Sequence, residues 1–130
     1  MKNEAMDKEV VFNFEKLNVY QKSLDFVDLV YSIVKEFPKE ERFVLGAQYR
    51  RAALSISLNI GEGQGSSDAQ FNRYLDIALN SLKECVVCST IARRQEYIDV
   101  KIDNDCRLKL EELAKMIQGV KKFIKLKSNN

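Results

Sequence analysis

The stretch Gln48-Tyr-Arg-Arg-Ala-Ala-Leu-Ser-Ile-Ser-Leu-Asn-Ile-Gly-Glu-Gly63 decides the fold of this 130-residue chain. At about 100° per residue, a helix through it sorts the residue types by face. A polar stripe has apolar surface on both sides. The stripe consists of Gln48, Arg51, Ser55, Asn59 and Glu62. One flank comprises Leu45, Tyr49, Ala52, Ile56 and Ile60, and the other Ala47, Leu54 and Leu58. The pattern predicts a helix that packs on two sides and ends at glycine.

A polar stripe between two apolar flanks is expected to be at least partly buried. Buried amide and charged groups destabilise a protein unless they are paired. Two interpretations stay open: the stripe fixes how helices or subunits register, or it belongs to a wide amphipathic helix with a few satisfied polar residues. For Arg51 we expect a carboxylate partner on the following helix, with Asp76 as the first candidate and Glu84 as the second.

Apolar residues at alternating steps of three and four predict four helices, over residues 14–36, 39–63, 68–95 and 103–125. Pro38 stops the first helix, and Ser67 with Gln70 forms a capping box that starts the third. Short connections favour an antiparallel up-down-up-down four-helix bundle. In that topology the loop at residues 63–67 and the end of the last helix share one end of the bundle. The predicted domain covers residues 14–126, with a leader at 1–13 and a tail at 127–130.

Two of these helices carry more apolar surface than one bundle requires. In the first helix the expected core stripe is Leu17, Tyr20, Leu24, Val27, Tyr31 and Val34. Further apolar residues lie on the reverse face of this helix and beside the core stripe of the third. These candidate oligomer-interface residues are Val19, Phe26, Ile33, Ile77, Cys88 and Ile91. A regular row of outward apolar residues favours an interface between copies; the alternative is scattered surface hydrophobes.

Length, charge and cysteine usage limit the class of protein. The length suits one domain, and the net charge of +2 is too small to indicate nucleic acid by itself. Three cysteines make an odd count, and the first nine residues are charged, unlike a secretory leader. No apolar run is long enough to span a bilayer. A reducing cytoplasm is therefore the expected compartment.

The residue types that carry most catalysis and metal binding are missing or badly placed. The chain has no histidine, the commonest general base and metal ligand. Cys85 and Cys88 sit inside a helical pattern, and with Cys106 they still lack a fourth zinc ligand. The glycine-rich loop at 61–67 lacks the Gly-Lys-Ser/Thr ending of a phosphate loop. We expect no cofactor, no metal and no enzymatic activity, and we interpret the cysteines as buried and unreactive.

Basic residues are unevenly distributed. From Arg107 to the end of the chain, basic residues outnumber acidic ones by five. The candidate nucleic-acid-binding residues are Arg50, Arg93, Arg94, Lys121, Lys122, Lys125 and Lys127. The alternative is an ordinary solvated face. Association of several copies would multiply each patch, and phosphate affinity grows with the number of neutralised charges. No base-stacking platform or recognition motif is visible, so binding would depend on shape and charge.

The central stretch also resembles a known family. Gln-x-Arg-Arg-Ala-Ala-x-Ser-Ile-x-x-Asn-Ile-x-Glu-Gly is similar to the signature of the 23S rRNA intervening-sequence protein family. Supporting motifs are Leu17-Asn-Val-Tyr-Gln-Lys-Ser, Phe37-Pro38-Lys-Glu-Glu and Ser81-Leu-Lys-Glu84. The resemblance covers about residues 14–124. Gly61 departs from it, because the family is expected to have alanine there, and we expect this glycine to end the second helix earlier.

The resemblance implies a four-helix bundle that assembles as a homopentameric barrel or ring. It also implies similarity to the accessory protein of diversity-generating retroelements, which binds nucleic acid and a reverse transcriptase. The leading functional expectation is a non-enzymatic oligomeric protein that binds structured RNA or DNA. The alternative is a protein-interaction adaptor that binds a partner protein and no nucleic acid.

Overall fold

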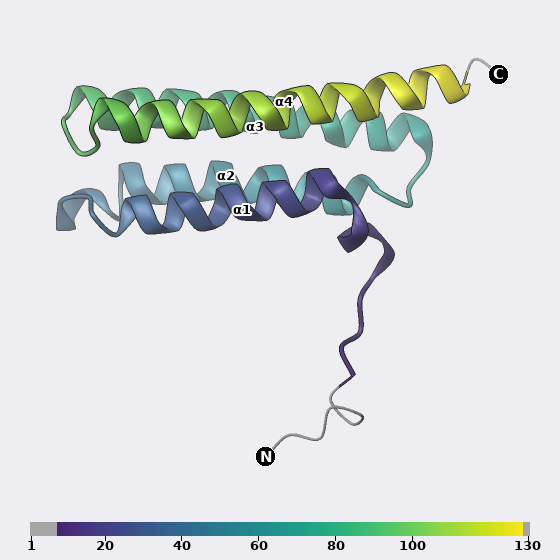
Figure 1. Ribbon diagram of the computed structural model, residues 1–130, viewed down its shortest axis with the longest axis horizontal. Helices are drawn as coiled ribbons and strands as arrows, with labels where there is room; N and C mark the ends of the chain where they lie inside the picture. The colour runs from purple at the N-terminus through teal and green to yellow at the C-terminus, as the bar shows by residue number, and fades with distance from the viewer. Residues whose placement is uncertain (1–7, 129–130) are drawn as a thin grey trace.

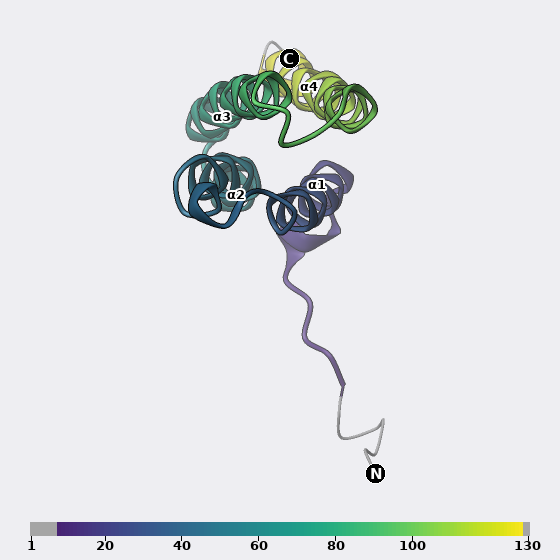
Figure 2. The ribbon, with the colours of Figure 1, turned by 90° about the vertical axis from the view of Figure 1, so that its left-hand side faces the viewer.

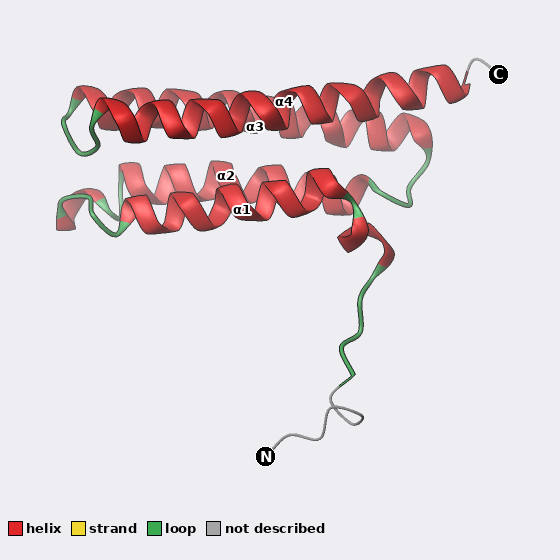
Figure 3. Cartoon of the chain, in the orientation of Figure 1, coloured by secondary structure: helices red, strands yellow, loops and turns green. Residues whose placement is uncertain are grey.

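Four long helices make up most of residues 8–128, the part of the chain that the computed structural model describes (Figures 1 and 3). They are α1 (Asn18–Val34), α2 (Leu45–Gly63), α3 (Asp68–Arg94) and α4 (Val100–Ser128). Two short 3-10 turns, η1 (Asn13–Lys16) and η2 (Lys39–Glu41), precede α1 and α2. Since no strand occurs in this range, the predicted all-α class is confirmed.

The helices lie in two layers, α1 beside α2 and α3 beside α4 (Figures 1 and 2). The α1–α2 and α3–α4 connections lie at one end, and the α2–α3 connection lies at the other (Figure 1). α2 and α3 share the most extensive contact, and α1 and α4 share less than any neighbouring pair in the bundle. All four helices contribute to one core, whose largest fully buried side chains include Tyr49, Phe26, Ile56, Leu75 and Leu113.

The buried face of α1 differs from the predicted one. Val19, Phe26 and Ile33, expected on an outer surface, are core residues of the single chain, whereas Tyr31 of the expected core stripe is exposed. Helical spacing shows that α1 has two apolar stripes, but it does not show which one its neighbours cover. The serine at position 23, which looks like a surface residue in the sequence, is buried in the covered stripe. Its hydroxyl shares a 2.9 Å hydrogen bond with that of Ser57 on α2.

α2 begins six residues later than predicted. After Pro38 the chain makes a 3-10 turn, in which the amides of Glu41 and Arg42 donate to the Pro38 carbonyl. The Arg42 side chain also donates to the Phe37 carbonyl at 3.0 Å. Val44 has a non-helical backbone, so the continuous helix starts at Leu45. Local hydrogen bonds at this connection therefore outweigh the helical spacing of the sequence.

The other end of α2 corrects one prediction and confirms another. Gly61 does not end the helix, which continues to Gly63. A Cβ on Gly63 would lie 2.7 Å from the Phe71 ring, so this glycine permits close approach of α2 and α3. Gly65 then turns the chain with a φ of +91°. Ser67 caps α3 as predicted, accepting a 3.2 Å hydrogen bond from the Gln70 amide.

α4 is longer than predicted at both ends. Asp99 caps its start, with its carboxylate accepting from the Ile102 amide at 2.8 Å. Lys127 and Ser128, expected in a frayed tail, belong to the last turn. The remaining tail residues 129–130 and leader residues 1–7 lie outside the described residues, while residues 8–12 run away from the bundle (Figure 1). None of the helices within residues 8–128 combines the length and hydrophobicity needed to cross a bilayer.

Candidate assembly and nucleic-acid surfaces

The polar stripe of α2 runs along its junction with α3. Ser55 and Ser81 share a 2.7 Å hydrogen bond across that junction. The Asn59 amide donates to the Ser55 carbonyl at 2.7 Å and to its hydroxyl at 3.1 Å. Ser55 and Asn59 are half-buried, as predicted, whereas Gln48, Arg51 and Glu62 are exposed. Within one chain, only the middle of the stripe is a packed hydrogen-bonded network.

Arg51 does not have the predicted partner. No ion pair of Arg51 exists within the described part of the chain, and Asp76 pairs instead with Lys121 of α4. The Ser55–Ser81 contact places Arg51 at the level of Glu84, the second candidate, yet the two charged groups do not meet. The guanidinium of Arg51 is therefore exposed on the outer surface of the bundle, beside α3.

The outward surface of α2 is apolar next to this stripe. Leu54 and Leu58 are 37% and 61% exposed, and they lie one turn apart on the helix. Ile77 and Ile91 of α3, two predicted interface residues, are also exposed at 41% each. Cys88, predicted with them, is buried in the core. Of the predicted interface residues, Ile77 and Ile91 of α3 therefore remain on the surface, whereas α1 contributes none of the three residues predicted from it.

Four of the candidate basic residues gather on the last turns of α4. Lys121 donates to Asn72 at 2.8 Å and pairs with Asp76, while Lys127 pairs with Asp68 at 3.2 Å. Lys122 and Lys125 are exposed and form no ion pair within residues 8–128. A shallow groove of about 610 Å³ between α3 and α4 is lined by Asp68, Asn72, Gln118, Lys121, Lys122, Lys125 and Ser128, among others.

The remaining candidate arginines lie elsewhere. Arg50 stacks over the Tyr31 ring, 5.8 Å from its centroid, on the α1–α2 side. Arg93 and Arg94 lie in the last turn of α3, near the opposite end from the lysines. Arg94 is exposed, but Arg93 is engaged by Asp103. The structure thus divides the candidate set into three separate places, of which the α4 lysines are the most concentrated.

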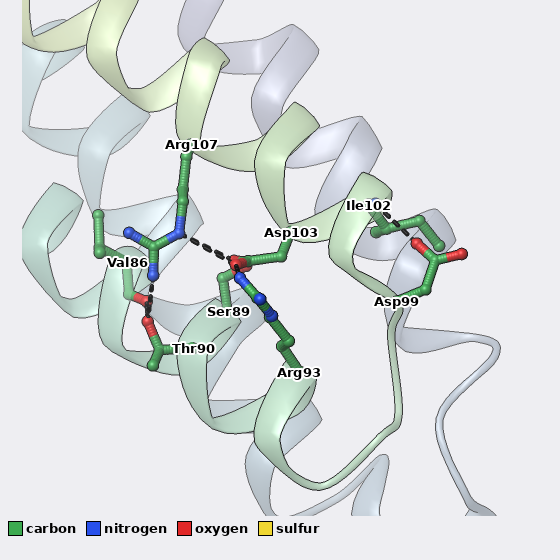
Figure 4. A network of polar contacts seen from close by, with 8 residues as sticks. All are labelled: Val86, Ser89, Thr90, Arg93, Asp99, Ile102, Asp103 and Arg107. Carbon is green, nitrogen blue, oxygen red and sulfur yellow. Dashed lines mark hydrogen bonds and ion pairs between the residues drawn. The ribbon is translucent and has the colours of Figure 1, made fainter.

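A buried ionic cluster that sequence reasoning missed joins α3 to α4 (Figure 4). Asp103 is 1% exposed and accepts hydrogen bonds from Ser89 at 2.6 Å and Arg93 at 3.2 Å. Arg107 donates to the same carboxylate at 3.1 Å and to Thr90 at 2.6 Å. Burial opposes ionisation, but the hydrogen bonds from Ser89, Arg107 and Arg93 outweigh it and hold the pKa of Asp103 below its usual value.

One signal for this cluster was present in the sequence. Asp103 lies three and seven residues before Cys106 and Leu110, on the same apolar stripe of α4. A carboxylate at a core position predicts paired burial. Arg107 lies four residues later on the same helix and is a partner that helical spacing indicates, whereas Ser89 and Arg93 belong to another helix and were not predictable.

The three cysteines are buried and form no disulfide. Burial raises the pKa of the Cys88 thiol to about 11, and it raises those of Cys85 and Cys106 as well. Thiolate is the reactive form of cysteine, so these thiols are shielded from chemistry near neutral pH. Among residues 8–128, no group of three or more Cys, Asp and Glu side chains is placed to hold a metal ion.

Four helices around one core define the structural class of this protein, an all-α four-helix bundle. The family model of the 23S rRNA-intervening sequence proteins matches residues 15–119. The chain belongs to that family, which confirms the resemblance drawn from the Gln48–Gly63 signature.

A solved structure supports the same assignment. It is a Bacteroides thetaiotaomicron protein described as having unknown function and belonging to the S23 ribosomal protein family. The two are 29% identical with a TM-score of 0.74, over 80% of this chain and 98% of that one. No curated protein matches this chain significantly.

Proposed function

We propose that this protein is a non-enzymatic oligomeric scaffold that binds structured RNA, or nucleic acid more generally, through basic surface repeated by self-association. The observation that carries the proposal is the α2 edge, the exposed pair Leu54 and Leu58. It lies beside the polar stripe, of which only Ser55 and Asn59 are packed and hydrogen-bonded within one chain. The α4 lysines provide the surface on which phosphates bind.

A second copy of the chain is the expected occupant of the α2 edge. Leu54 and Leu58 leave apolar area in water, and they line a shallow pocket together with Phe14, Tyr20 and Leu24 on the α1 side. Arg51 lies next to Leu54 and Leu58, and no carboxylate within residues 8–128 pairs with it. Contact between two copies would cover the leucines and offer Arg51 a carboxylate from the neighbour. The family resemblance implies a ring of five antiparallel up-down-up-down bundles, and the alternating connections in Figure 1 support that topology for the unit.

Phosphate is the ligand group that the end of α4 fits. Lys122 and Lys125 are exposed and lie three residues apart, on neighbouring turns of α4. Lys121 lies beside them in the groove. Each phosphate contact releases counterions, so affinity rises with the number of lysines that reach the backbone. One chain offers few such contacts, whereas a ring repeats them in every subunit. Binding of this kind discriminates by shape and charge.

The test combines light scattering after size exclusion with filter binding of several structured RNAs across a salt series. We expect a multi-subunit mass and micromolar binding with a steep salt slope, weakened by Lys122→Glu with Lys125→Glu. Lys109→Glu with Lys115→Glu is the matched control, because it changes the same charge on α4 outside the cluster. A monomer at all concentrations, or no binding at low salt, would refute the proposal.

A protein-interaction adaptor is the second candidate, favoured by a specific observation. Asp76, Asp68 and Asp103 already neutralise Lys121, Lys127 and Arg93 within the chain. This reduces the charge left for phosphate and leaves a mixed polar surface that suits a protein partner. Copurification of partners after nuclease treatment separates the two functions. For either function, three unoxidised buried thiols fit a reducing cytoplasm.

A further inference from the structure

An apolar arm precedes the bundle. Val10, Val11 and Phe12 are 77%, 52% and 63% exposed, three consecutive large side chains without cover from the described chain. Phe12 stacks on Phe14, with 6.4 Å between ring centroids, and is still mostly in water. Three adjacent apolar side chains left in water are unfavourable. We call residues 9–12 the arm.

The turn at the root of the arm directs it away from its own bundle. In η1 the Phe12 amide donates to the Glu15 carboxylate at 2.8 Å, and the Glu15 amide donates back to the Phe12 carbonyl at 3.0 Å. The Gln21 side chain donates to the Glu15 carbonyl at 2.8 Å, which ties the turn to α1. Figures 1 and 2 show the arm running away from the α3–α4 layer.

A groove of about 670 Å³ opens between the start of α1 and the last turns of α4, closed below by the α2–α3 connection. Clefts of this size are large enough to hold several side chains. The groove stays open where Gly119 has no side chain to fill it. Its apolar walls include Leu17, Phe71, Met116, Val120 and Phe123, and Lys127 is at its rim.

We propose that the arm of one copy docks in this groove on a neighbouring copy, so that the arm straps subunits together. The inference rests on the self-association proposed above and names a second contact for it, separate from the α2 edge. Docking within one chain is disfavoured, because Leu17 of the groove is five residues from Phe12 and the η1 turn would have to open.

The chemistry of the arm matches the groove. Val10, Val11 and Phe12 are each more than half exposed, so a groove with apolar walls on more than one side covers more of their surface than a flat surface would.

Disulfide trapping between two variants, each with one added cysteine, tests the contact. Chains with Val11→Cys and chains with Phe123→Cys are mixed, allowed to exchange and oxidised mildly. Both positions are exposed, so the bundle is expected to fold, and the native cysteines are buried and do not compete. We expect a band at twice the 15.0 kDa chain mass. Adding Val10→Asp to the arm variant should abolish it.

The control replaces Phe123→Cys with Leu108→Cys, an exposed position on α4 outside the groove. If the Val11→Cys and Phe123→Cys mixture yields no more disulfide-linked dimer than this control, the proposal is overturned. So would a chain carrying both Val11→Cys and Phe123→Cys that forms only an internal disulfide, since the arm would then dock on its own groove. Light scattering of the unmodified protein separates the outcomes: a multi-subunit mass without the trapped band refutes the arm contact alone, and a monomer refutes self-association as well.

Discussion

Asp103 is a buried carboxylate whose charge is stabilised by hydrogen bonds from the protein. It receives hydrogen bonds from Ser89 and from two arginines while being almost inaccessible to water. The arginines themselves are about half exposed, so water solvates the parts of their charge that face outward. The carboxylate, by contrast, depends entirely on its protein partners.

Asp103→Asn should lower the free energy of unfolding by about 1.5–3 kcal/mol, the range for hydrogen bonds to charged groups. The amide keeps the shape of the side chain but loses the charge that both guanidinium groups contact. Urea denaturation followed by circular dichroism measures the change. Asp105→Asn is the control, because its i,i+4 pair with Lys101 is exposed and should matter by less than about 1 kcal/mol. Equal effects of the two substitutions would contradict the role of the cluster.

The same carboxylate should make the protein sensitive to acid. The folded pKa of Asp103 lies below that of the unfolded chain, which is about 3.9. Its contribution is therefore fully present above that value and is lost as the pH falls through the lower folded pKa. The stability difference between the unmodified protein and Asp103→Asn should be constant near neutrality and shrink below about pH 4. A difference that persists unchanged at pH 3 would count against this account.

Two glycines in helices show that one residue type has opposite roles in different elements. Gly63 lies where α2 meets α3, and an added Cβ would come within 2.7 Å of Phe71 and 2.9 Å of Tyr74. Gly119 lies in exposed α4, and nothing would lie within 4 Å of its Cβ. A glycine inside a helix destabilises it unless close packing requires that residue.

Gly63→Ala should therefore destabilise the protein by about 1–3 kcal/mol through overpacking. Gly119→Ala should stabilise it by roughly 0.5–1 kcal/mol by reducing the freedom of the unfolded chain. Thermal and urea unfolding at one fixed protein concentration would show the two signs, since the proposed self-association would link stability to concentration. Stabilisation by both alanines would mean that α2 and α3 are not in close contact at Gly63.

Among the elements, α3 shows why some predictions succeeded, and α1 shows why others failed. Both ends of α3 agree with the prediction to within one residue, because Ser67 caps its start through a local contact. The core face of α1 was wrong, since two apolar stripes satisfy the helical period and the choice depends on neighbouring helices. Ser23 illustrates the difficulty: it is a core residue only because Ser57 of α2 lies opposite it.

At the scale of the whole molecule, the proposed self-association places the outward face of α2 between copies. Leu54→Ser with Leu58→Ser should lower the mass observed by light scattering, because apolar area no longer drives contact there. The secondary structure should be unchanged, since both side chains point outward. Leu108→Ser, at a 57% exposed position on α4, is the matched control and should leave the mass as it is. An unchanged mass in the double variant would exclude the α2 edge as an interface.

The sequence by itself determined the all-α class, the four helices, the cap of α3 and membership of the 23S rRNA-intervening sequence protein family. These features depend on periodicity, capping and a contiguous signature, all of which are local along the chain. Only the tertiary structure decided which stripe of α1 is buried, that Asp76 pairs with Lys121 and not Arg51, and that Asp103 joins two arginines. Each depends on contacts between different helices, whose distances are set when the helices pack; of the partners of Asp103, Arg107 alone lies on its own helix.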